Sequence, residues 1–176
     1  MGKHATYRVT IASAGDILVE GKIVCEVCNG VNAGLVTDHQ WKSYKINKWE
    51  DIFDVELSPQ EIVNKLEKEC DILICLFHKR FGTSSSPGKP CNLESFLQSY
   101  DIWKSLKKPH VLLFFKEVKV SSLEDIKNPQ LLNVFALKDR ILEDNVLTVD
   151  DFKEPNEFCE KVQDRLDSLT CDDTAE

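Results

Sequence analysis

The sequence contains no apolar run close to the roughly 20 residues that a membrane-spanning helix needs. Its amino end, Met-Gly-Lys-His-Ala-Thr, leads into an expected strand without the hydrophobic region of a secretory signal. The formal net charge is -8, so the chain lacks the basic excess with which proteins bind nucleic acids or membrane surfaces. We therefore expect a cytoplasmic protein with neither nucleic acid nor a membrane among its partners.

Several signatures of well-known α/β enzymes are also absent. The chain has no G-x-x-x-x-G-K-[ST] motif, no G-x-G-x-x-G motif and no G-x-S-x-G motif. These absences argue against a P-loop nucleotide site, a Rossmann dinucleotide fingerprint and a serine nucleophile elbow. A phosphoacceptor receiver needs an aspartate at the carboxyl end of its central strand, but Asp71 lies at the amino end of that expected strand and His78 follows the other end.

The seven cysteines do not form a pattern that predicts a metal site or disulfides. Their number is odd, and the single C-x-x-C pair, Cys25 and Cys28, lies on an expected helix without a second pair to complete four zinc ligands. We expect reduced cysteines packed as small hydrophobic residues, and no metal. Cys91 differs because it lies in a polar loop just before Glu94.

Strand and helix signals alternate along the whole chain. The expected strands are residues 7–13, 71–77, 110–115 and 146–149, with a further short strand within 35–49. The expected helices are residues 17–32, 58–68, 92–106, 123–145 with a break at Pro129, and 155–169.

The two continuous apolar runs, 71–77 and 110–115, indicate strands buried on both faces, as in the interior of a parallel sheet. The sequence therefore predicts an α/β fold: a flavodoxin-like three-layer sandwich with a parallel sheet of about five strands. We expect one domain over residues 1–170, followed by an acidic tail at 171–176.

Polar residues follow the first and the middle expected strands. Ser13 ends the first expected strand and Gly15 and Asp16 follow it, whereas His78 and Arg80 come after the middle strand. In open α/β sheets, ligands bind outside the carboxyl ends of the strands, where these segments meet.

Glu94 begins the next helix, and a helix amino end favours a negative charge. A single carboxylate beside sugar hydroxyls can orient a ribose and stabilise the oxocarbenium character that develops as a glycosidic bond breaks. Taken alone, Glu94 is equally consistent with a carboxylate that stabilises the helix end, Arg80 with a surface cation and Trp49 with a packing aromatic.

The order of these signals resembles the TIR (Toll/interleukin-1 receptor) superfamily, especially its prokaryotic TIR-like domains. The resemblance covers roughly residues 7–165. The matching segments are Val9-Thr-Ile-Ala-Ser-Ala-Gly-Asp16, Trp49, Ser58-Pro-Gln-Glu-Ile62, Cys70-Asp-Ile-Leu-Ile74, Arg80-Phe-Gly82 and Glu94 ahead of Phe96.

The resemblance implies that the chain cleaves the nicotinamide N-glycosidic bond of NAD, by hydrolysis or cyclisation, as a self-associating signalling or defence effector. NAD would be the substrate, no separate cofactor would be needed, and TIR-type contacts would form a homo-oligomer. Glu94 would be the catalytic residue and Arg80 would bind the diphosphate. Ser13 and Gly15 would shape the pocket floor, and Trp49 would be an aromatic wall.

Two positions depart from the family pattern. Glu20-Gly21 stands where such domains often have a Glu-Arg pair, and Lys89-Pro-Cys-Asn92 stands where they often have Ser-Gly-Thr. Two alternatives therefore stay open: a non-catalytic TIR-type interaction module, and a nucleoside deoxyribosyltransferase-like enzyme with a glutamate nucleophile.

The polar loop 83–91, between Arg80 and Glu94, is a candidate lid over a bound nucleotide.

Overall fold

A computed structural model of the chain describes residues 5–14, 16–33, 42–48, 57–81 and 93–172. The elements along the chain are β1 (Ala5–Ser13), α1 (Leu18–Asn32), β2 (Lys42–Lys48), α3 (Pro59–Glu69), β3 (Ile72–Phe77), α4 (Leu93–Leu106), β4 (His110–Lys116), α5 (Leu123–Ile126), α6 (Pro129–Asp144), β5 (Val149–Phe152) and α7 (Pro155–Asp172).

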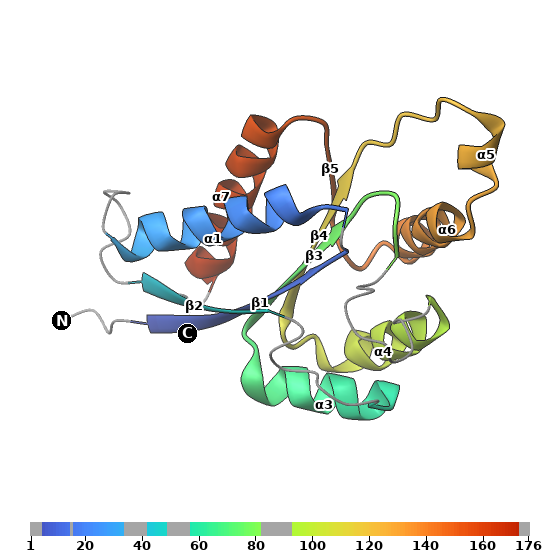
Figure 1. The fold of residues 1–176 in the computed structure, drawn as a ribbon. Coiled ribbons are helices and arrows are strands. Elements are labelled where there is room, and N and C mark those ends of the chain that lie inside the picture. The colour runs from blue at the N-terminus through green and yellow to red at the C-terminus, as the bar shows by residue number, and fades with distance from the viewer. Residues whose placement is uncertain (1–4, 15, 34–41, 49–56, 82–92, 173–176) are drawn as a thin grey trace.

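The five strands form one parallel sheet in the order β2-β1-β3-β4-β5. This is the flavodoxin-like order, so the predicted fold class is confirmed. Strands β3 and β4 are inner strands, as the two apolar runs predicted. The helices α1 and α7 cover one face of the sheet, and α3, α4 and α6 lie on the other (Figure 1).

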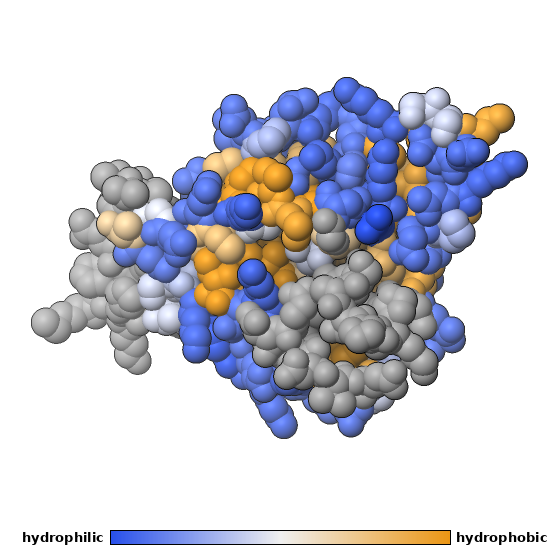
Figure 2. Space-filling view, in the orientation of Figure 1, coloured by the Kyte–Doolittle hydropathy of each residue, from blue (hydrophilic) through white to orange (hydrophobic). Residues whose placement is uncertain are grey.

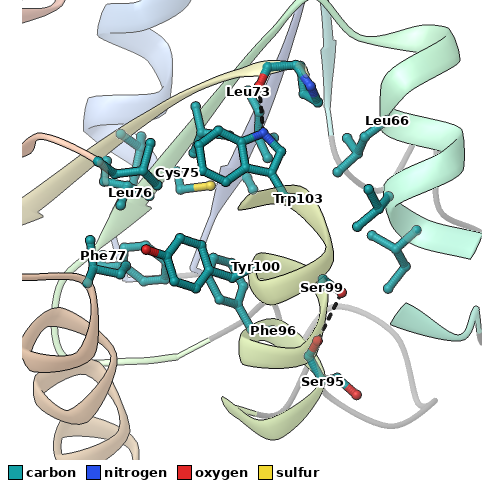
Figure 3. Close-up of a pocket in the computed structure, with 18 of the residues that line it drawn as sticks. Leu66, Leu73, Cys75, Leu76, Phe77, Ser95, Phe96, Ser99, Tyr100 and Trp103 are labelled. Atoms are coloured by element: carbon teal, nitrogen blue, oxygen red, sulfur yellow. Dashed lines mark hydrogen bonds between the residues drawn. The ribbon is translucent and has the colours of Figure 1, made fainter. Parts of the chain in front are cut away.

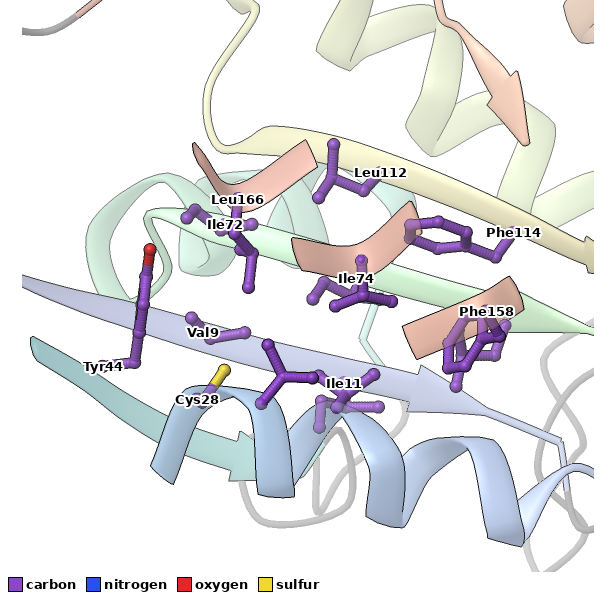
Figure 4. Close-up of a cluster of buried hydrophobic side chains, with 14 of the residues drawn as sticks. Val9, Ile11, Cys28, Tyr44, Ile72, Ile74, Leu112, Phe114, Phe158 and Leu166 are labelled. Carbon is purple, nitrogen blue, oxygen red and sulfur yellow. The ribbon is translucent and has the colours of Figure 1, made fainter. Parts of the chain in front are cut away.

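The central strand β3 divides its side chains between two hydrophobic cores. All six of its residues are buried, because both faces of the sheet are covered. Ile72, Ile74 and Leu76 join the core under α1 and α7, where Phe114 and Phe158 also pack (Figure 4). The alternate residues, Leu73, Cys75 and Phe77, join the core under α3, α4 and α6.

Two helix boundaries follow from local chemistry that the sequence already displayed. Ser58 caps α3 by accepting the backbone N–H of Glu61, whose carboxylate accepts the backbone N–H of Ser58 in return. Asn128 caps α6, and Pro129 occupies its first turn, where the missing N–H costs nothing. The predicted break at Pro129 therefore separates α5 from α6.

The last strand was predicted in the wrong place. It spans Val149–Phe152 rather than residues 146–149. The apolar residues Val146 and Leu147 precede this strand and lie outside the sheet. Val146 is exposed, and Leu147 packs against the core under α3, α4 and α6. Arg165 neutralises Asp150 within the strand, with its Nε 2.6 Å from the carboxylate. Helix α7 also continues past residue 169 to Asp172.

At the amino ends of the strands, which we call the amino edge of the sheet, Asp71 joins the start of β3 to β1. Its carboxylate accepts hydrogen bonds from the backbone N–H of Arg8 at 2.7 Å and from Arg8 Nε at 3.0 Å and Nη2 at 2.8 Å. These bonds hold the pKa of Asp71 below its ordinary value, since they favour the charged form. This ion pair joins the residues that directly precede Val9 and Ile72, the first register pair of β1 and β3.

The edge strand β2 is bonded to the end of α1 through one side chain. Asn32 accepts the backbone N–H of Tyr44 at 2.6 Å and donates to the carbonyl of the same residue at 2.8 Å. The side chain of Asn32 therefore binds both backbone polar groups of one residue on an outermost strand.

The five cysteines whose side chains the structure describes, Cys25, Cys28, Cys70, Cys75 and Cys159, form no disulfide. Burial raises the pKa of the Cys28 thiol to about 12. Within the same residues, no helix is long and apolar enough to cross a membrane. The surface shown in Figure 2 is mostly hydrophilic, with hydrophobic residues gathered over α1.

Candidate functional site

The strand order places the candidate site between β1 and β3. The chain reverses its winding at this point, and ligands of such sheets bind outside the carboxyl ends of the two strands. Ser13 ends β1 and lies opposite Leu76 of β3. The segments that follow these strands therefore meet at the carboxyl ends of the strands, which we call the carboxyl edge of the sheet, as the sequence predicted.

Asp16 connects the two segments directly. One of its carboxylate oxygens, Oδ2, accepts the backbone N–H of Lys79 at 2.9 Å and lies 3.2 Å from Nδ1 of His78. The other oxygen, Oδ1, is buried and has no hydrogen-bond partner among the described residues. A buried carboxylate oxygen without a partner is unusual, and it marks this edge as a place where a ligand or water could bind.

Burial lowers the pKa of His78 from its ordinary value, because the charged imidazolium loses solvation. The negative charge of Asp16 opposes this effect, and the positive charges of Lys116 and Lys79 reinforce it. The neutral form of His78 is therefore favoured over the imidazolium. A neutral imidazole beside a carboxylate can accept or relay a proton.

A second ion pair crosses the same edge from α1 to β4. Glu20 is buried, with 2% of its side chain exposed, and its Oε1 lies 2.6 Å from Nζ of Lys116. A buried carboxylate requires such a partner. Sequence reasoning noted Glu20 only as a departure from a family pattern, because its partner lies 96 residues along the chain.

Glu94 and Arg80, the predicted catalytic and diphosphate-binding residues, are both exposed. Glu94 lies in the first turn of α4, and its Oε1 accepts a long hydrogen bond of 3.4 Å from Nε2 of Gln98. Arg80 lies in the turn that follows β3. Both residues are accessible to a ligand, and each comes from a segment that reaches the candidate edge.

An apolar cavity of about 100 Å³ lies between β3 and the helices α3 and α4. Ser13 from β1 and Ser95 from the first turn of α4 both line it, whereas Glu94 and Arg80 are not among its described lining residues. Phe77, Phe96 and Trp103 supply much of its wall (Figure 3). The structure thus brings Ser13 to the helix that carries Glu94, but not into contact with Glu94 itself.

Several predicted features lie outside the described residues: Gly15, Trp49, Cys91 and the loop 83–91. Within the described part of the chain, no three histidine, cysteine, aspartate or glutamate side chains are grouped so that they could hold a metal ion.

Comparison with known proteins adds a family but no activity. Residues 34–167 match the family described as "Domain of unknown function (DUF4062)". No curated protein matches the chain. Among solved structures, the chain is similar to UDP-N-acetylglucosamine 4-epimerase from Bacillus cereus, with 12% identity and a TM-score of 0.41. That match covers 84% of this chain and 53% of the epimerase chain, so this chain spans about half the length of that protein.

Proposed function

The chain belongs to the DUF4062 family, and we propose that it cleaves the nicotinamide N-glycosidic bond of NAD, with Glu94 as the catalytic residue. One observation carries the proposal: an exposed glutamate occupies the first turn of the helix that follows the central strand β3, beside the point where the sheet reverses its winding. That is where a flavodoxin-like sheet binds its ligands.

The chemistry requires few protein groups. The bond between the ribose C1′ and the nicotinamide nitrogen breaks, and its electron pair leaves with neutral nicotinamide. The carboxylate of Glu94 would orient the ribose hydroxyls and stabilise the oxocarbenium ion. In hydrolysis, water then bonds to C1′ and loses a proton to solvent. In cyclisation, an adenine ring nitrogen bonds to C1′ through its lone pair, and the adenine ring takes up the positive charge. Arg80 would bind the diphosphate, since a guanidinium pairs well with phosphate oxygens.

Ser13 supports the proposal because it shares the apolar cavity with Ser95, the neighbour of Glu94. Self-association would complete the site around the exposed carboxylate, in keeping with the resemblance to TIR domains. The cysteines that the structure describes form no disulfide, which fits the cytoplasmic location that we propose together with this function.

The test measures loss of NAD at high protein concentration for the wild type, Glu94→Gln and a control, Glu67→Gln. Glu67 is an exposed glutamate on α3, so its replacement removes the same charge away from the candidate site. We expect Glu94→Gln to slow NAD cleavage by about 100-fold or more and Glu67→Gln to leave the rate unchanged. Equal rates for the wild type and Glu94→Gln would remove Glu94 from the mechanism. Exchange of bases between deoxynucleosides without NAD cleavage would instead favour the deoxyribosyltransferase alternative.

The exposed apolar side chains of α5 and α6 favour a second function, a homotypic interaction module. Leu123 is 75% exposed and Ile126 is 51% exposed on α5, and Leu132 and Phe135 of α6 are also exposed. Apolar surface of this kind is typical of protein contacts when it is contiguous. Sedimentation velocity over a range of concentrations tests this function. We expect Leu123→Glu to abolish self-association and Glu124→Gln, a neighbouring exposed change, to preserve it.

A further inference from the structure

A second cavity, of about 530 Å³, lies at the carboxyl ends of β4 and β5. Its size falls within the range of about 300–1,000 Å³ that is usual for small-molecule sites. Strands β4 and β5 and the helices α6 and α7 all contribute to its walls, and its described lining shares no residue with the apolar cavity. It is therefore a separate space at the same edge of the sheet.

Four lysines from separate parts of the chain converge on this cavity: Lys116, Lys138, Lys153 and Lys161. The side chains of Lys116, Lys138 and Lys161 are only 28%, 26% and 35% exposed. Lysine side chains are mostly exposed in proteins, and the chain as a whole has a net charge of -8. Three carboxylates, Glu117, Asp151 and Glu157, and the imidazole of His78 line the same cavity.

Carboxylates hold these ammonium groups in place. Lys161 Nζ lies 2.7 Å from Glu157, Lys153 Nζ lies 3.1 Å from Glu117, and Lys138 pairs with Asp151. Asp151 is 61% exposed and Glu117 is 44% exposed, so water can solvate these carboxylates when another anion takes their lysines. Lys116 stays fixed by the buried Glu20. The ammonium groups are thus held in advance around a space that an anion can enter.

Aromatic rings provide an apolar wall beside the charges. Phe115 and Phe152 are buried in the lining, and Phe135 is 40% exposed. Nζ of Lys138 lies 5.4 Å from the centroid of the Phe115 ring. A ligand that fits both features carries a multiply charged anionic group for the lysines and a flat or apolar body for the phenylalanine side.

We propose that this cavity binds a small organic phosphate, with the phosphate among Lys138, Lys153 and Lys161 and the apolar body against Phe135. Lysine binds phosphate as a point charge, so several lysines can share one dianionic group without the paired geometry that arginine imposes. This site does not depend on Glu94 and is independent of the proposed NAD cleavage.

Titration calorimetry at low salt tests the site with three probes: phenyl phosphate, inorganic phosphate and phenol. We expect saturable binding of phenyl phosphate, weaker binding of inorganic phosphate and none of phenol. Lys153→Gln and Lys161→Gln should each weaken phenyl phosphate binding by about tenfold. Lys45→Gln, which removes an exposed lysine from β2, should leave the affinity unchanged. Phe135→Ala should weaken phenyl phosphate binding and leave inorganic phosphate binding unaffected.

Lys153 is 71% exposed, so its replacement leaves the fold intact and keeps the test informative if Lys161→Gln is destabilised. Equal affinities in Lys153→Gln, Lys45→Gln and the wild type would overturn the proposal, as would the absence of saturable phenyl phosphate binding. Glu94→Gln should bind phenyl phosphate like the wild type. Failure of the NAD assay together with intact phosphate binding would refute the proposed activity and leave this site in place.

Discussion

The two edges of the sheet use similar charged residues in different ways. At the amino edge, both carboxylate oxygens of Asp71 accept hydrogen bonds from Arg8. At the carboxyl edge, Asp16 leaves one buried oxygen without a partner in the described structure, and His78 beside it has a lowered pKa. The first arrangement satisfies its polar groups within the fold, whereas the second leaves capacity for a ligand. The difference separates groups that hold the fold together from groups available for chemistry.

The largest expected effect concerns the buried pair at the carboxyl edge. Lys116→Met leaves the buried Glu20 without its cation, and removal of one partner from a buried pair is strongly destabilising. We expect the free energy of unfolding to fall by about 3 kcal/mol, measured by urea denaturation. Lys119→Met, an exposed control three residues along, should change it little. The double variant Glu20→Gln with Lys116→Met should recover part of the loss. A loss no greater than that of the control would show that Glu20 does not need Lys116.

A smaller effect is expected at the amino edge. Asp71→Asn removes the charge that accepts from Arg8, and we expect a loss of roughly 1–2 kcal/mol, since about a third of the side chain is exposed and solvent screens the pair. Asp139→Asn, an exposed aspartate on α6, is the control. Because the folded pKa of Asp71 is lowered, its contribution is present above its ordinary pKa of 3.8 and is lost as the pH falls through the folded value. The stability difference between the wild type and Asp71→Asn should therefore shrink below about pH 4. A difference independent of pH there would contradict the ionic origin of the effect.

The smallest effect is a pH dependence at His78. Its folded pKa is lowered, so the folded state disfavours the protonated ring. The associated stability is fully present above the ordinary value of 6.5 and is lost as the pH falls from 6.5 through the folded value. Urea denaturation at about pH 8, 7, 6 and 5.5 measures the free energy of unfolding of the wild type and of His78→Gln. The advantage of the wild type should decline as the pH falls. Parallel curves for the wild type and His78→Gln would remove the difference that we infer between the edges.

Patterns within single segments of the sequence predicted most of the fold. The apolar run before His78 indicated the central strand, and Ser58 with Glu61 indicated the start of α3, because each signal is complete within a few neighbouring residues. The strand β5 was predicted three residues too early, at 146–149, because its own four residues include two aspartates. One of these, Asp150, is neutralised by Arg165, which only the packing of α7 brings close.

The site was predictable in part for the same reason. The sequence placed Ser13, Asp16 and His78 at one edge, since each follows an expected parallel strand. It did not predict the pair between Glu20 and Lys116 or the lysines around the second cavity. These residues lie on α1, β4, α6 and α7 and directly after β5, so they meet only when the chain has folded, and no local spacing in the sequence indicates the contact.

The bond from Asn32 to Tyr44 has a consequence for how copies of this chain meet. An outermost strand presents free N–H and C=O groups to which a strand of another molecule can add, and repeated addition leads to fibrils. The amide of Asn32 already occupies both groups of Tyr44, at 2.6 and 2.8 Å, near the middle of β2. A strand from a neighbouring molecule would have to displace this side chain before it could extend the sheet. The side chain of Asn32 thus protects this strand against the addition of a strand from another molecule.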